Sequence, residues 1–160
     1  MREFQLVKDS CRKGKNNHDN FKMPQRATEK SSGYDFFNNL NEDIIVKAGE
    51  KYTYWTDIKY VSQARQEFLM IIPRSSLGIK KDMRLANTVG DIDIDYANNI
   101  SNDGNIAICI KNDGTEDLVI PKGQAIAQGI IVNFNIVDND VPKSKERIGG
   151  IGSTTLWKKD

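Results

Sequence analysis

The sequence of 160 residues has few of the features that mark special classes of protein. No apolar run approaches the roughly 20 residues that a membrane-spanning helix needs, so a membrane protein of that kind is not expected. Cys11 and Cys109 lie far apart, and neither forms a CxxC pair or a cluster with the only histidine, His18. A disulfide framework and a Cys/His zinc site are therefore not expected.

A strong excess of charge and a targeting signal are also lacking. Lysine and arginine number 23 and aspartate and glutamate 22, so the overall charge does not predict a nucleic-acid partner. The first ten residues contain no apolar stretch of the kind that a secretory signal requires. We therefore expect the protein in the cytoplasm, or in the host cytoplasm if a virus encodes it.

β-Branched residues dominate the apolar side chains. Isoleucine and valine number 27, whereas leucine and alanine number 15, and β-branched side chains favour strands over helices. Short apolar runs alternate with turn signals, which predicts an all-β domain of the sandwich, jelly-roll or barrel type. The expected strands lie at 44–46, 52–60, 68–72, 106–110 and 126–136.

Three of these segments carry more specific expectations. The parity of Ile126, Ile130 and Val132 predicts that they share one face of the last strand. Cys109 alternates with isoleucines, which predicts a small buried side chain without a reactive role. After Pro73, the sequence predicts a helix of about two turns from Ser75 toward 81.

The chain divides into three expected parts. Residues 1–30 would form an N-terminal strand and a basic irregular arm, 31–137 the β domain, and 138–160 a flexible C-terminal arm. Within 11–30, six basic residues face two acidic ones, which favours a solvated loop and leaves a polyanion-binding arm as the alternative.

Two segments place groups that suit a phosphate and a cation. The small residues of 31–34 precede Asp35 and would deliver one carboxylate from a turn. Arg74, Ser75 and Ser76 would place a guanidinium and two hydroxyls at the start of the predicted helix, where backbone N–H groups attract anions. Ser75 as an ordinary helix N-cap explains the same residues equally well.

Two further segments combine like charges or glycines. Asp91, Asp93 and Asp95 alternate with isoleucines, which predicts three carboxylates on one face of an extended segment. A bound cation or a proton-transfer role would explain them, and a solvated face is the alternative. Arg147 and the glycine-rich residues 149–154 would suit an anion, with a flexible tail as the alternative.

In chain order, these segments resemble the five motifs of the trimeric dUTPase family. The resemblance covers residues 24–155, with motifs at 24–36, 73–78, 87–96, 122–129 and 147–154. It implies a jelly-roll β subunit that assembles as a homotrimer with active sites at subunit junctions. It also implies hydrolysis of dUTP to dUMP and pyrophosphate by water attack at the α-phosphate, with Mg²⁺ as the cofactor. That reaction keeps uracil out of DNA and supplies dUMP for dTMP synthesis.

The resemblance assigns roles around the base, the sugar and the reacting water. Asp93 would be the general base that orients water toward the α-phosphorus. Tyr96 would lie against the deoxyribose, where its ring leaves no room for a 2′-hydroxyl. The uracil would be bound by Asn87, Gly90, Ile92 and Ala107.

It also assigns the groups around the triphosphate. Asp35 would bind magnesium only through water, because the triphosphate itself holds most of the metal. A neighbouring subunit would bind phosphate oxygens through Arg74, Ser75, Ser76 and Gln128. A third subunit would close over the triphosphate with Arg147, Ile151, Gly152, Ser153 and Thr154.

The sequence departs from the family pattern at three places. Ile151 replaces a phenylalanine that stacks on uracil, a contact worth about 0.5–1.5 kcal/mol, so we expect weaker closure but intact chemistry. Gln124 and Ala125 replace an Asp-Arg pair. The residues after Tyr96 make a longer excursion, to Gly104, than the family's Arg-Gly turn.

One function from another class stays open at this point. A nucleotide-binding regulatory module of the same fold would use closure of the C-terminal segment to hold or release a protein partner. The altered residue 151 and the basic segment 11–30 motivate this alternative. Deamination of dCTP would need its own acid, base and water arrangement, for which the sequence shows no motif. No membrane and no nucleic-acid partner is expected.

Overall fold

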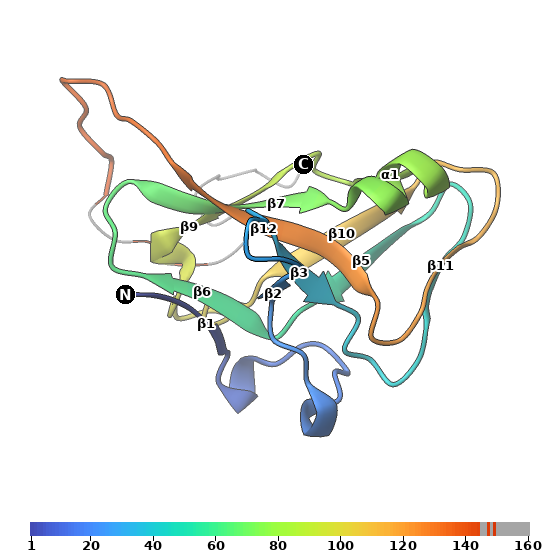
Figure 1. Cartoon of the computed structure of the whole chain (residues 1–160). Coiled ribbons are helices and arrows are strands. Elements are labelled where there is room, and N and C mark those ends of the chain that lie inside the picture. The colour runs from blue at the N-terminus through green and yellow to red at the C-terminus, as the bar shows by residue number, and fades with distance from the viewer. Residues whose placement is uncertain (145–146, 148, 150–160) are drawn as a thin grey trace, which may run out of the picture.

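The computed structural model describes residues 1–144, 147 and 149. This part of the chain is built from strands, three single-turn 3₁₀ helices and one short α-helix, which confirms the predicted all-β class (Figure 1). The strands are β1 (Arg2–Leu6), β2 (Gln25–Arg26), β3 (Tyr34–Phe37), β4 (Ile44–Val46), β5 (Lys51–Trp55), β6 (Ile58–Ser62), β7 (Glu67–Pro73), β8 (Met83–Leu85), β9 (Gly90–Asp93), β10 (Ala107–Asn112), β11 (Leu118–Ile120) and β12 (Ala125–Asn133). The helices are η1 (Asp9–Cys11), η2 (His18–Asn20), α1 (Ser75–Lys81) and η3 (Ile94–Tyr96).

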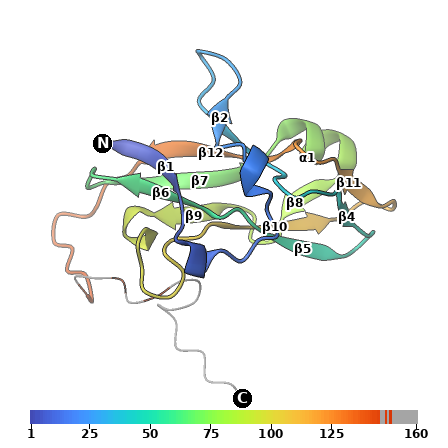
Figure 2. The ribbon, with the colours of Figure 1, turned by 90° about the horizontal axis from the view of Figure 1, so that it is seen from below.

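The strands form one large sheet and three smaller ones. The large sheet has the order β2-β3-β12-β7-β9, and the smaller sheets are β5-β10-β8, β1-β6 and β11-β4. Figures 1 and 2 show β7 and β12 lying over β5 and β10, with β4 and β11 beside them. All strand pairs are antiparallel. Two layers of antiparallel strands make a β-sandwich, which is one of the architectures that the sequence predicts.

One apolar core fills the space between the sheets. The large sheet contributes Phe36, Leu69 and Ile71, each no more than 2% exposed. The opposite sheet contributes Ile108 and Ile110, whereas their neighbours Ala107 and Cys109 on β10 are only partly buried. This period of two explains why β10 could be read from the sequence. Cys109 is only partly buried rather than buried as predicted, because it lies on the outer side of β10, and its Sγ accepts a 3.4 Å hydrogen bond from Thr53.

The last long strand differs from its predicted facing. The pairing of β12 with β3 shifts register between Ala125 and Ala127, so Ile126 and Ala127 both lie in the core. A bulge inserts one extra residue and thereby exchanges the two faces of a strand. Ile130 and Val132 consequently lie on the outer face, opposite to Ile126, and the predicted shared face is wrong.

The aromatic strand predicted at 52–60 is in fact two strands. β5 ends at Trp55 and pairs with β10, whereas β6 begins at Ile58 and pairs with β1. The corner between them contains Asp57, whose φ of +57° is rare for a residue with a side chain. Tyr54 on β5 and Tyr60 on β6 are both buried, one on each side of this corner.

The N-terminal segment is part of the folded body. β1 pairs with β6, and β2 pairs with the edge of β3. The sequence predicts a solvated loop at 11–30, but the residues before η2 donate hydrogen bonds to Asp57 in the β5–β6 corner, and His18 of η2 contacts the same carboxylate. The helix predicted from Ser75 is confirmed as α1. No helix in the described ranges is long and apolar enough to cross a membrane.

A buried carboxylate joins β1, β6 and β7. Glu67 accepts hydrogen bonds from Tyr60 at 2.7 Å, from Ser62 at 2.5 Å and from Arg2 at 2.8 Å, and its side chain is fully buried. Burial raises the pKa of Glu67, but the hydrogen bonds from Ser62, Tyr60 and Arg2 outweigh it, so the pKa lies below its ordinary value. The ionised carboxylate is thus the form that the fold stabilises.

We expect Glu67→Gln to destabilise the protein by about 1–3 kcal/mol at neutral pH, because a buried hydrogen-bonded group loses its charge. The pKa of a glutamate in the unfolded chain is about 4.3, and the pKa of Glu67 in the fold is lower. The stabilisation is therefore fully present above about pH 4.3 and is lost as the pH falls through the folded pKa. Urea unfolding of wild type and variant at neutral and acid pH measures this.

The deficit of the variant should shrink in acid. The exposed Glu50, changed to Gln, is the matched control and should change the stability little at either pH. An equal deficit for Glu67→Gln at both pH values would contradict the role of the charge.

Candidate active site

One group of predicted site residues meets where β3, β12 and α1 come together. Asp35 on β3 and Gln128 on β12 are direct cross-strand partners. The Arg74 Nη1 atom lies 3.2 Å from Asp35 Oδ2, and Gln128 Nε2 donates to the Pro73 carbonyl at 3.5 Å. We call Asp35, Arg74, Gln128 and the two serines that begin α1 the phosphate end of the site.

The start of α1 presents donors to solvent. Pro73 ends β7, Arg74 is the N-cap residue, and no side chain caps the helix. The interpretation of Ser75 as an ordinary N-cap is therefore wrong. Ser75 and Ser76 are exposed, and the N–H groups of a first helical turn have no partner within the helix. The two serines thus lie exposed at the start of α1, next to Arg74, whose guanidinium pairs with Asp35.

A second group lies where β9 ends. Asp93 is the last residue of β9, and the chain then enters η3 with Asp95 and Tyr96. Arg147 contacts both carboxylates: its Nε donates to Asp95 at 2.8 Å and its Nη2 pairs with Asp93. Its guanidinium carbon also lies 5.8 Å from the centre of the Tyr96 ring. We call Asp93, Tyr96 and the residues around them the base end of the site.

This geometry corrects one expectation. Asp91 and Asp93 share a face of β9, but Asp95 lies in a 3₁₀ helix rather than on the same extended segment. The prediction of three carboxylates on one strand face is therefore wrong for Asp95. The three charges still lie close enough to act on one another. Burial raises the pKa of Asp93, and the neighbouring Asp91 and Asp95 add to this, while Arg147 lowers it.

The ring of Tyr96 is firmly held. Only 6% of the residue is exposed, its hydroxyl donates to the Asn105 carbonyl at 2.9 Å, and the side chain of Asn102 donates to it at 2.7 Å. Burial raises the pKa of Tyr96, so the phenol is a neutral hydrogen-bond donor. Sequence reasoning found Tyr96 but missed Asn102 and Asn105. The asparagine-rich stretch 98–105 was the one available signal.

The residues predicted to bind a base lie on β9, at the start of β10 and in the exposed turn before β9. A tight turn follows Asn87, with the Val89 N–H donating to the Asn87 carbonyl at 2.7 Å. Gly90 then approaches β7 so closely that a Cβ would stand 3.0 Å from that of Ile71. Ile92, on β9, packs against the core, and the Ala86 N–H donates to the Cys109 carbonyl, which holds the segment alongside β10. Ala107 is at the start of that strand.

The two ends of the site are far apart within one chain. Asp35 is level with Ile72 on β7, through Gln128, whereas Asp93 is level with Phe68. The two carboxylates are thus three strand spacings apart across the sheet, about 14 Å, and four residues apart along it, about 13 Å. Both figures show α1 and β9 toward opposite ends of the molecule. Ile151, Gly152, Ser153 and Thr154 lie outside the described residues.

Comparison with known proteins identifies the family. The family model for dUTPase matches residues 19–155. The deoxyuridine 5′-triphosphate nucleotidohydrolase of Lactococcus lactis is 40% identical over 133 residues, which cover 82% of this chain and 87% of that protein. A crystal structure of dUTPase from Streptococcus mutans is 32% identical with a TM-score of 0.70, covering 85% of this chain and 98% of that chain.

A third likeness extends to a phage enzyme. A mutant dUTPase from phage phi11 of S. aureus, whose structure describes the coordination of a structural Mg(II) ion, is 19% identical with a TM-score of 0.63. It covers 91% of this chain and 98% of that chain, and at this identity it shows the fold alone. The family model and the Lactococcus relative each span most of the sequence, and therefore the chain belongs to the dUTPase family.

Proposed function

We propose that this chain hydrolyses dUTP to dUMP and pyrophosphate, with Asp93 as the general base that activates water toward the α-phosphorus. The observation that carries the proposal is the placement of Asp93 at the end of β9, directly before the turn that carries Tyr96 and on the same strand as Gly90. An acidic group whose pKa is raised is a better proton acceptor than an ordinary aspartate. Positioning of the water supplies the rest of the effect.

The pair between Arg147 and Asp93 bears on the same step. A triphosphate offers a guanidinium several charged oxygens in a geometry that suits two parallel hydrogen bonds. In the free chain Arg147 pairs with Asp93 and Asp95 of its own chain. When it leaves them to bind a triphosphate at the site of another subunit, the carboxylate of Asp93 becomes free to accept a proton.

Recognition of the sugar and the base falls to the base end. The Tyr96 ring packs on the deoxyribose and excludes a 2′-hydroxyl. Uracil lies against Asn87, the backbone at Gly90 and Ile92, and Ala107. Backbone donors and acceptors discriminate strongly between bases, because a mismatched base leaves buried polar groups unpaired.

Magnesium fits the phosphate end as an ion held mainly by the substrate. In the described ranges, no three His, Cys, Asp or Glu side chains are grouped to hold a metal. Magnesium requires about six oxygen ligands and keeps several waters, so Asp35 would contact it through water. Asp35 is largely buried and already paired with Arg74, which fits a role in orienting water rather than direct ligation. Magnesium would neutralise charge on the triphosphate, as would Arg74, Ser75, Ser76 and Gln128.

The assembly is a homotrimer with shared active sites. A dUTP molecule cannot reach from Asp93 to Arg74 of the same chain in the arrangement of the large sheet, so the phosphate end comes from a neighbouring subunit. The outer face of that sheet supports this, since it carries a row of partly exposed apolar side chains: Phe68, Met70, Ile72, Ile130 and Val132. Such a face on both central strands is typical of a subunit interface. The cytoplasmic location stays a prediction.

We predict a particle of about 54 kDa by light scattering, because three chains of 18.1 kDa are needed to complete each site. Val132→Asp should disrupt the trimer and the activity together, since it places a charge on the apolar outer face. Val119→Asp, on the exposed side of β11, is the matched control. A monodisperse monomer that hydrolyses dUTP would refute the shared site.

We predict that UTP and dCTP are poor substrates. The 2′-hydroxyl of UTP should clash with Tyr96 and reduce kcat/KM by at least about 100-fold, and the mismatched base of dCTP should cost about 10⁴-fold. Pyrophosphate release from each nucleotide with magnesium measures both. Comparable turnover of dUTP and UTP would remove Tyr96 from its assigned role, and ammonia release from dCTP would indicate a deaminase instead.

The sharpest test of the mechanism is Asp93→Asn. The amide keeps the shape and one acceptor but cannot take up a proton, so kcat should fall about 10²–10⁴-fold. Affinity for a non-hydrolysable dUTP analogue should hold within several-fold, because the phosphates are bound by other groups. Asp91→Asn, on the same face of β9, is the control and should lower kcat far less. A kcat above about a tenth of wild type for Asp93→Asn would mean that the base is misassigned.

A further inference from the structure

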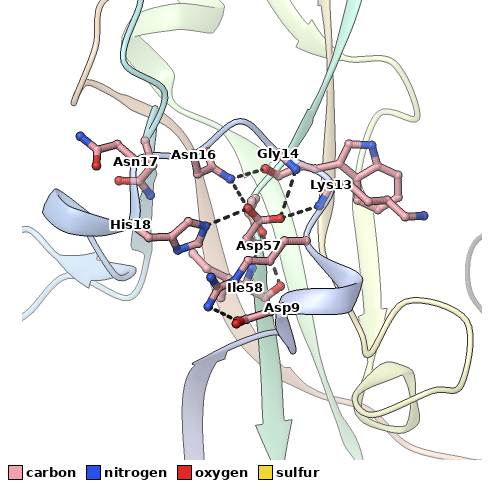
Figure 3. Close-up of polar contacts among 12 residues, drawn as sticks. Asp9, Lys13, Gly14, Asn16, Asn17, His18, Asp57 and Ile58 are labelled. Atoms are coloured by element: carbon pink, nitrogen blue, oxygen red, sulfur yellow. Dashed lines mark hydrogen bonds and ion pairs between the residues drawn. The ribbon is translucent and has the colours of Figure 1, made fainter.

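The corner between β5 and β6 buries a carboxylate. Asp57 is 0% exposed, and its two oxygens accept hydrogen bonds from the Lys13 N–H at 3.0 Å, the Gly14 N–H at 3.2 Å and the Asn16 side chain at 2.7 Å. Figure 3 shows these residues wrapped around Asp57, with His18 Nε2 at 3.4 Å from it. A carboxylate in this position would be very costly without such donors. The N-terminal segment thus donates three of the hydrogen bonds that the Asp57 carboxylate accepts.

A further hydrogen bond to this carboxylate comes from Asn105, close to Tyr96 at the base end of the site. The side chain of Asn105 donates to Asp57 Oδ1 at 3.0 Å and accepts the Asp57 N–H at 3.0 Å. The two residues are therefore joined by a reciprocal pair of hydrogen bonds, and both are completely buried. The Asn105 amide also donates to the Cys11 carbonyl at 3.0 Å. These hydrogen bonds fix the orientation of the Asn105 side chain.

Asn105 also contacts Tyr96 directly. Its backbone carbonyl accepts the Tyr96 hydroxyl at 2.9 Å, and Asn102 supplies the second hydrogen bond to the same oxygen. Asn102 is itself fixed by the amide of Asn99 at 2.6 Å. The Tyr96 hydroxyl thus donates one hydrogen bond and accepts another, and because both partners are held in place, these bonds determine where the ring can lie.

The loop that carries Asn102 and Asn105 has a second attachment to β6. Lys59 donates to Asn98 at 2.7 Å and to Asp103 at 3.0 Å, and the side chains of Lys59 and Asp103 are 8% and 2% exposed. Gly104 completes the loop with a φ of +84°, where a Cβ would stand 2.7 Å from Ala97 Cα. The backbone from 97 to 105 is thus held on both sides, and its geometry relies on the first residues of β6.

We propose that Asp57 is a positioning residue for sugar selection: it fixes Asn105, and with Asn102 this holds the Tyr96 ring where a ribonucleoside triphosphate cannot fit. This rests on the proposed function, in which Tyr96 contacts the deoxyribose. A displacement of the ring by a fraction of an ångström opens space for a 2′-hydroxyl. The preference for dUTP over UTP then decreases, although no group that contacts the phosphates has changed.

Two variants remove different hydrogen bonds among the residues that hold Tyr96. Asp57→Asn keeps the shape but presents an NH₂ group to donors, and Asn102→Ala removes a direct partner of the Tyr96 hydroxyl. For each, kcat/KM for dUTP and UTP and the Kd of non-hydrolysable analogues of both should be measured. We expect the ratio of kcat/KM for dUTP to kcat/KM for UTP to fall at least about tenfold in both variants. The kcat for dUTP should stay within several-fold of the wild-type value.

A matched control separates positioning from stability. His18→Phe removes one contact to Asp57 on the side of the N-terminal segment and keeps an aromatic ring against Phe21, where the two rings stack at 5.1 Å. It should lower the melting temperature but leave the ratio unchanged. If Asp57→Asn does not fold, Asp57→Gly replaces it, because glycine adopts a φ of +57° without strain.

The outcomes are distinguishable. If wild type discriminates between the nucleotides and the Asp57 and Asn102 variants keep its ratio, the inference is overturned and the proposed function stands. An equal fall in the ratio for His18→Phe would also overturn it, because any loosening of the N-terminal segment would then be sufficient. If wild type neither binds nor hydrolyses dUTP, the proposed function fails and the inference fails with it.

Discussion

The pairing of β7 with β12 on one side and β9 on the other fixes the position of both ends of the site. Pro73 ends the strand at one end, so that Arg74 and α1 begin beside Asp35 and Gln128. At the other end, Phe68 pairs with Asp93. The length of β7 thus separates the groups proposed to bind phosphate from those proposed to bind base and sugar. Because one chain holds these groups at opposite ends of the sheet, we propose that the complete site is composed of residues from different chains.

Buried carboxylates tie segments that are distant in sequence to this framework. Glu67 joins β1 to β6 and β7, Asp57 joins the N-terminal segment to Asn105, and Asp103 joins the loop after η3 to Lys59. Burial raises the pKa of Asp103, but the Lys8 N–H and Lys59 outweigh it and lower the pKa overall. Each carboxylate accepts several hydrogen bonds, because a buried polar group without partners is costly.

Where a pattern depends on neighbours in the sequence, it predicted the structure well. The period of two along β10 and the Pro73-Arg74-Ser75 boundary before α1 both rest on local chemistry, and both are confirmed. The facing of Ile130 failed because a bulge depends on how β12 meets β3. The single strand at 52–60 failed because its corner is imposed by the different partners of β5 and β6.

The sequence by itself determined the β class, the short helix, the order of the five motifs and the residue types of the site. Tertiary structure alone decided that Asp93 and Asp35 lie at opposite ends of one sheet, and that Asn102 and Asn105 hold Tyr96. The tie between Asp57 and Asn105 spans 48 positions. No periodicity reports such a contact, because it arises only when two loops from different strands meet in the folded core.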